Sequence, residues 1–228
     1  MARTLSLALL VIFCSATLAE DPPKGVVVDK DKGTVTVDAK MAPRKLEDPK
    51  FKGEQWPLEV LACWGYPKGE KAHETVVTID DVKPSDVHKG LESLGLKPGK
   101  PGRGEAKAEG PEVNVYLEFA GPDDQPKRLP IEKCLSDPAS GKPMPKVKWI
   151  FTGSAMSKPD PTKDETVYGA DLRGTLITIF PVTDETVLQT SLTAKDMKFL
   201  RSKMETDPKV LPKVGTAVKL IIEVADKK

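Results

Sequence analysis

The chain has 228 residues, with 35 Lys and Arg, 34 Asp and Glu, and a formal net charge of +1. A nucleic-acid-binding protein needs a basic face, and this even balance argues against one. The length allows one large domain or two small ones.

The N-terminus has the pattern of a cleavable signal peptide over residues 1–19. Arg3 gives a positive start, residues 5–18 are uncharged and mostly apolar, and Ala19 ends a stretch that a signal peptidase recognises. A helix needs roughly twenty apolar residues to cross a bilayer, so we expect a secreted or periplasmic protein with no membrane span after cleavage. Cys14 lies in the segment to be removed.

Two cysteines remain after this cleavage, Cys63 and Cys134. In an oxidising compartment an isolated pair most simply forms one disulfide, which typically adds roughly 2–4 kcal/mol to stability. We therefore predict a Cys63–Cys134 disulfide, with two buried free thiols as the alternative.

Residues 20–50 are expected to form an N-terminal linker and a β-hairpin. β-branched runs at 26–28 and 34–37 flank a turn that contains Gly33, and this arrangement is typical of hairpins. Residues 51–228 are then expected to form a single domain.

Within that domain, apolar residues at every second position predict strands of a half-buried sheet. The expected strands are residues 58–63, 75–79, 113–119, 147–151, 175–180 and 218–224. The stretch 175–180 is apolar on both faces and is expected to lie centrally in the sheet.

Two short helices are predicted, one after Pro84 and one after Thr193. In the first, Ser85 is the expected N-cap and Leu91 belongs to the apolar stripe; in the second, Thr193 caps and Asp196 follows three residues later. The fold class is therefore α+β: a mostly antiparallel sheet with two short helices packed on it. Three long Pro- and Gly-rich loops are expected at residues 97–111, 136–146 and 157–165.

The most chemically suggestive residues are His73, Glu74 and His88. Two imidazoles and a carboxylate form a donor set for zinc or another divalent transition metal. Val77 stands where a zincin helix has its second histidine, so the alternative is that the two histidines lie apart and have structural roles. No other cofactor is predicted.

Other catalytic patterns are absent from the sequence. The segment around Ser154, Gly153-Ser154-Ala155-Met156, lacks the second glycine of a nucleophile elbow. No phosphate-binding loop follows an expected strand, and the sequence contains no Cys-x-x-Cys motif. Trp56, Trp64 and Tyr66 are candidates to line a small-molecule groove, although core packing also explains them.

The chain resembles the YdjY-like domain family of bacterial exported proteins over roughly residues 55–225. The segments that carry the likeness are HETVV (73–77), VKPSDVH (82–88), LESLGLKPG (91–99), VNVYLE (113–118), WIFTGS (149–154) and YGADLRG (168–174). The resemblance implies a secreted or periplasmic domain without a settled activity. It draws attention to His73, Glu74, His88 and Ser154 as matching polar positions.

The leading functional hypothesis is a non-enzymatic exported domain that binds a partner protein, an envelope component or a small ligand. The alternative is a metal-binding protein or metal-dependent enzyme that uses His73, Glu74 and His88. A third possibility is a structural envelope module whose long loops make the contacts.

Overall fold

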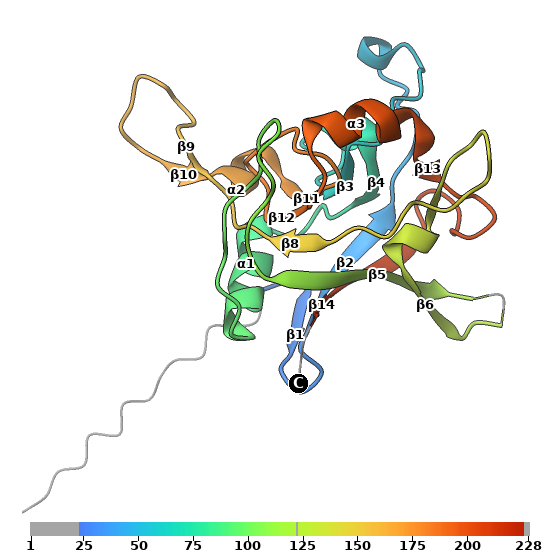
Figure 1. The fold of residues 1–228 in the computed structure, drawn as a ribbon, viewed down its shortest axis with the longest axis horizontal. Helices are drawn as coiled ribbons and strands as arrows, with labels where there is room; N and C mark the ends of the chain where they lie inside the picture. Colours follow the sequence, from blue (N-terminus) through green and yellow to red (C-terminus); the bar gives the residue numbers. More distant parts are fainter. Residues whose placement is uncertain (1–22, 122, 226–228) are drawn as a thin grey trace, which may run out of the picture.

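The computed structural model describes residues 23–121 and 123–225 (Figure 1). The predicted signal peptide, residues 1–19, lies outside them. Within these ranges no helix combines the length and the hydropathy that a membrane crossing requires.

Eight strands of the described chain close into a mixed β-barrel. Going round the barrel, they are β2 (Thr34–Met41), β14 (Ala217–Val224), β5 (Glu112–Ala120), β8 (Trp149–Phe151), β12 (Leu188–Thr190), β11 (Thr175–Thr178), β3 (Val60–Cys63) and β4 (Thr75–Thr78). The ring closes because β4 also pairs with β2, through Lys40 opposite Thr78 and Met41 opposite Val77. Only β11–β12 and β3–β4 are parallel pairs within this ring.

The period-two patterns predicted from the sequence are confirmed. In β5 every second residue from Val113 to Phe119 is buried while the intervening residues are partly exposed, and Val218, Leu220 and Ile222 of β14 are buried. All four residues of β11 are buried, as its uninterrupted apolar run predicts. The inward-facing side chains of these strands form one continuous hydrophobic core.

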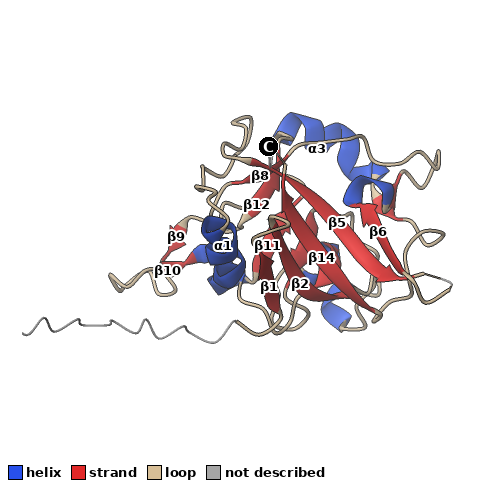
Figure 2. Cartoon of the chain, turned by 90° about the horizontal axis from the view of Figure 1, so that it is seen from below, coloured by secondary structure: helices blue, strands red, loops and turns tan. Residues whose placement is uncertain are grey.

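The predicted hairpin is present as β1 (Val26–Asp29) paired antiparallel with β2. Gly33, in the connecting turn, has φ +67°, a conformation that favours glycine. β2 continues four residues beyond Val37 and pairs with both β14 and β4. The hairpin is therefore part of the barrel rather than a segment ahead of it, and β1, β2, β14, β5 and β6 (Pro126–Pro130) lie side by side in Figure 2.

The first predicted helix is α1 (Pro84–Ser93), which packs against β1 and β2. Val87 and Leu91 on its apolar stripe are fully buried. Ser85 does not cap it: the N-cap residue is Lys83, Pro84 takes a first-turn position, and the Ser85 N–H donates to Asp171 Oδ1 at 2.8 Å. The expected cap was wrong because a carboxylate from another element supplies the acceptor.

The second predicted helix is α3 (Ala194–Leu200), followed by the 3-10 turn η4 (Arg201–Lys203). Its predicted capping is confirmed, because Thr193 and Asp196 bond to each other's backbone N–H groups. A third helix, α2 (Gly169–Arg173), was not predicted. It ends at Gly174, where φ is +68° and an added Cβ would lie 2.2 Å from Trp64 ring atoms.

The three predicted loops are present, each with short pairings at its base. The remaining elements of the described chain are the 3-10 turns η1 (Pro49–Phe51), η2 (Ala72–Glu74) and η3 (Ile131–Lys133), and the strands β7 (Leu135–Ser136), β9 (Met156–Ser157), β10 (Val167–Tyr168) and β13 (Glu205–Thr206). Strand β9 pairs with β10, and β13 pairs with β7. The α+β class thus holds in coarse form, as a β-rich barrel with three short helices.

The structure does not form the predicted disulfide, since Cys63 and Cys134 are both buried free thiols. Cys63 ends β3, whereas Cys134 follows η3, next to the β5–β6 pair. β3 and β5 are four strands apart in either direction round the barrel, so the two cysteines belong to opposite sides of it. Burial is the main cause that raises the pKa of each thiol to about 12.

The burial of Leu91 predicts a large loss of stability for Leu91→Ala. Removing a fully buried leucine side chain leaves a cavity and costs about 2–4 kcal/mol. Urea denaturation measures this change, with Lys89→Ala on the exposed face of the same helix as the control. Equal stabilities of the two variants would contradict the packing of α1 on β1 and β2.

Because Cys63 and Cys134 are free thiols, we expect an alkylating reagent to modify both of them without prior reduction. Unfolding in urea with iodoacetamide and no reductant should modify Cys63 and Cys134, and peptide mapping detects both products. The folded protein should react far more slowly, because thiolates are the reactive form and burial disfavours them. A crosslinked Cys63–Cys134 peptide pair would contradict the structure.

Candidate functional site

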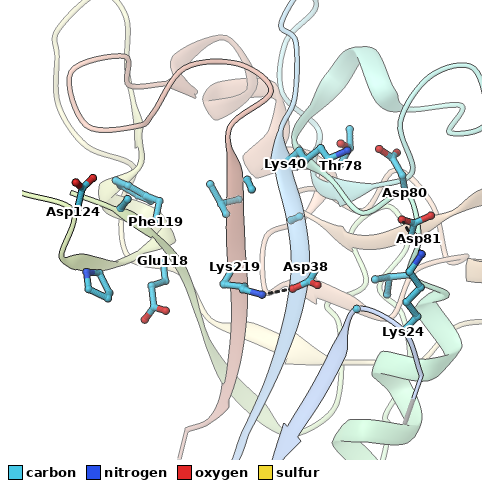
Figure 3. Close-up of a pocket in the computed structure, with 17 residues that line it drawn as sticks. Lys24, Asp38, Lys40, Thr78, Asp80, Asp81, Glu118, Phe119, Asp124 and Lys219 are labelled. Atoms are coloured by element: carbon cyan, nitrogen blue, oxygen red, sulfur yellow. Dashed lines mark hydrogen bonds and ion pairs between the residues drawn. The ribbon is translucent and has the colours of Figure 1, made fainter. Parts of the chain in front are cut away.

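The main cavity is a groove of about 530 Å³ where β4 and β5 end, β14 begins and β2 passes between them (Figure 3). This volume lies within the range of roughly 300–1,000 Å³ typical of small-ligand sites. Its lining residues come from five strands (β2, β4, β5, β6 and β14), the chain ahead of β1 and two turns: Lys24, Gly25, Asp38, Ala39, Lys40, Thr78, Asp80, Asp81, Val82, Glu118, Phe119, Ala120, Asp124, Pro126, Ala217, Val218 and Lys219.

Strand register explains why a hollow forms here. Lys40 of β2 lies opposite Thr78 of β4 on one side and Ala217 of β14 on the other. Small neighbours leave the space beside the Lys40 side chain unfilled. Residues that lie opposite one another on neighbouring strands form a row across the sheet. Two residues before Lys40 on β2, the next row on the same face consists of Asp38, Lys219 of β14 and Glu118 of β5. Residues two apart on a strand point to the same face, so this charged row borders the hollow.

Half of the eight charged side chains that line the groove form ion pairs within it. Lys219 Nζ is 2.5 Å from Asp38 Oδ1, and Lys24 Nζ is 3.7 Å from Asp81 Oδ2. Asp80 Oδ1 accepts a hydrogen bond from the Gly65 N–H at 2.7 Å.

The other four charged side chains, Lys40, Asp80, Glu118 and Asp124, form no ion pair with any described residue. Five acidic and three basic side chains line the groove, which gives it a surplus of two negative charges when all are ionised.

His73 and Glu74 belong to a separate, buried charge cluster. They end η2, which leads into β4, and Glu59 lies just ahead of β3. Lys71 Nζ lies 3.0 Å from Glu59 Oε2 and 2.7 Å from Glu74 Oε2, while His73 Nε2 lies 3.3 Å from Glu74 Oε1. Arg201 of η4 binds Glu59 at 2.5 Å. The cluster thus connects the starts of β3 and β4 with the segment that follows α3.

The two glutamates of this cluster titrate differently. Burial first, and then the adjacent Glu59, raise the pKa of Glu74 to about 7 despite the opposing effect of Lys71. Burial also opposes ionisation of Glu59, but hydrogen bonds from Glu74 and Lys71 outweigh it and hold its pKa below the ordinary value. Burial, followed by the Lys71 charge, lowers the pKa of His73. Of the two glutamates, Glu74 is therefore the one that holds a proton more readily.

His88 lies in a third group of residues, between α1, β10 and the start of α2. Its Nδ1 is 2.7 Å from the Tyr168 hydroxyl, which accepts a hydrogen bond from the Ser154 N–H at 3.2 Å. The Ser154 Oγ accepts from the Ala170 N–H at 2.9 Å and donates to the Ala155 carbonyl. Burial is the leading cause that raises the pKa of Tyr168, so its hydroxyl stays protonated. These bonds connect α1, β10 and α2, and the Ser154 hydroxyl donates to a backbone carbonyl rather than to His88.

The structure brings together two of the three predicted metal ligands. His73 and Glu74 are in contact, whereas His88 bonds to Tyr168 and faces Glu92. Across the described ranges no group of three or more His, Cys, Asp and Glu side chains is arranged to hold a metal ion.

None of the sequence-predicted residues lines the groove. Of the three candidate aromatic residues, Trp64 is buried with its Nε1 donating to the Val82 carbonyl. Trp56 packs on His73, and Tyr66 packs on Phe51. One sequence signal pointed to the groove: the charged residues Asp38 and Lys40 alternate with the apolar residues Ala39 and Met41. This period-two pattern indicates that the second strand of the hairpin continues beyond residue 37 and carries the two charges on one face.

The arrangement defines a closed-barrel domain with an open surface groove. The chain belongs to the YdjY family, because the model of the YdjY domain matches residues 26–223. This match includes the hairpin, in agreement with the place of β2 in the barrel. No curated protein and no solved structure matches the chain.

The raised pKa of Glu74 predicts a pH-dependent stability. A carboxyl group whose pKa is higher in the folded than in the unfolded protein stabilises the fold below its unfolded value of about 4.5, and this contribution disappears as the pH rises through about 7. The contribution of Glu74 to the free energy of unfolding should therefore decrease between pH 5 and pH 8, whereas His73, whose pKa is lowered, contributes with the opposite sign.

Glu74→Gln cannot titrate at this position, so the difference in the free energy of unfolding between the wild type and this variant should decrease from pH 5 to pH 8. Urea denaturation at several pH values measures the free energy of unfolding of each protein. The control Glu54→Gln changes an exposed glutamate and should keep the pH dependence of the wild type. An unchanged pH dependence in Glu74→Gln would contradict the proton-holding role of Glu74.

Proposed function

We propose that this chain is an exported, non-enzymatic binding domain and that the groove between β4, β2, β14 and β5 is its ligand site. The signal-like residues 1–19 support export, with cleavage after Ala19 into a secreted or periplasmic location. The groove is the single observation that supports binding, since its volume suits a small ligand and it lies on paired, well-packed strands.

The composition of the groove favours binding over catalysis. Its lining, so far as the described chain provides it, contains lysines, carboxylates, one threonine and apolar residues. Histidine, cysteine and serine are not among these residues, and four of the lysine and carboxylate side chains that could act as bases or nucleophiles are held in ion pairs. The groups His88, Tyr168 and Ser154 bond to one another elsewhere.

The metal-dependent alternative has less support. His73 and Glu74 supply two adjacent donors, but Lys71 and Arg201 already neutralise the two glutamates there. A third protein donor is expected in most stable zinc sites, and His88 has other partners.

A groove-filling substitution tests the proposal. Ala217 is exposed at the groove floor, and Ala217→Trp should occupy the hollow while remaining compatible with a strand. A thermal-shift screen with amino acids, short peptides, sugars and nucleotides finds a ligand, and calorimetry then measures its affinity. The variant should weaken binding by about tenfold or more.

Ala139→Trp, in an exposed loop outside the groove, is the matched control and should bind as the wild type does. A ligand that binds Ala217→Trp with unchanged affinity would show that the groove is not its site. The absence of any hit in all four compound classes would also contradict the proposal.

A further inference from the structure

We infer that the groove binds a short peptide-like molecule, with its carboxylate at Lys40 and Thr78 and a cationic group near Asp124 and Glu118. This inference rests on the proposed function and specifies the chemistry of the ligand. It is drawn from the charges of the groove that no described side chain neutralises and from the separation between them.

Lys40 is the anion-binding end of the groove. Its side chain is exposed and forms no ion pair with a described residue, since Asp38 pairs with Lys219 and Asp80 Oδ1 accepts a hydrogen bond from the Gly65 N–H. Thr78 lies directly opposite Lys40 across the β2–β4 pair and is the only hydroxyl in the described lining. An ammonium beside a hydroxyl donates charge-assisted hydrogen bonds to a carboxylate.

The opposite end of the groove is acidic. Glu118 near the end of β5 and Asp124 in the β5–β6 turn have no ion-pair partner among the described side chains, and Figure 3 shows them across β14 from Lys40. Together with the surplus of two negative charges, this end attracts a cation and repels a ligand with net negative charge.

The distance between the two ends suits a tripeptide. β5 is two strands away from β2, or about 10 Å at roughly 4.8 Å per strand. An extended chain spans at most about 3.4 Å per residue, so three residues reach about 10 Å. The exposed alanines Ala217 and Ala120 between the two ends leave room for the peptide backbone.

The test compares three defined probes by calorimetry and by NMR amide shifts. They are Lys-Ala-Ala, its C-terminal amide, and Glu-Ala-Ala. Lys-Ala-Ala should bind most tightly and shift the amides of Lys40 and Ala217. Blocking the carboxylate should weaken binding roughly five- to tenfold, and Glu-Ala-Ala should bind less tightly because of its net negative charge.

Matched variants test each end. Lys40→Gln should weaken Lys-Ala-Ala binding roughly five- to tenfold. This variant should also bind Lys-Ala-Ala and its C-terminal amide with equal affinity. Asp124 has φ +59°, and Asn adopts this conformation readily, so Asp124→Asn changes the charge alone and should weaken binding about three- to fivefold. Lys142→Gln, an exposed lysine outside the groove, should leave the affinity unchanged.

The outcomes separate this inference from the proposed function. Equal affinity for the three probes at the groove would overturn the inference and leave the groove as a binding site. No shift of groove amides with Lys-Ala-Ala would also overturn it, while a different compound that Ala217→Trp fails to bind would still support the proposed function.

Discussion

The pairing of β2 with β4 is the interaction on which the rest of the structure depends. It consists of two residue pairs, Lys40 with Thr78 and Met41 with Val77, extended by a hydrogen bond from the Ala42 N–H to the Val76 carbonyl. Without it the ten strands of this sheet would have two open edges along the barrel seam. With it, inward-facing side chains from eight strands form one hydrophobic core, and burial of that core stabilises the fold.

The same pairing creates the groove. It places Thr78 beside Lys40, and the register with β14 places Ala217 on the other side. The charged row of Asp38, Lys219 and Glu118 is a consequence of the same registers. A slip of one residue in β2 would turn Lys40 toward the core, so the chemistry of the groove and the closure of the barrel depend on one alignment.

Local signals predicted much of the fold, whereas long-range pairing was not predictable from one sequence. The alternation in β5 and β14, the hairpin turn at Gly33 and the capping box at Thr193 act over a few residues, and these predictions were confirmed. β12 was not predicted because its three residues are all buried and show no alternation. The disulfide prediction was wrong because the positions of Cys63 and Cys134 depend on strand order round the barrel. The candidate site was missed because Lys40, Ala217 and Glu118 are distant in sequence and ordinary as residues.

The most direct test of the account is a nuclear Overhauser measurement across the closing pair. The hydrogen bond from Ala42 to Val76 makes Met41 and Val77 a non-hydrogen-bonded pair, whose Cα atoms lie about 4.5 Å apart. The closed barrel predicts a strong contact between the Hα protons of Met41 and Val77, alongside contacts from β2 to β14. A spectrum in which β2 contacts β14 but shows no contact with β4 would contradict the closed barrel and the groove together.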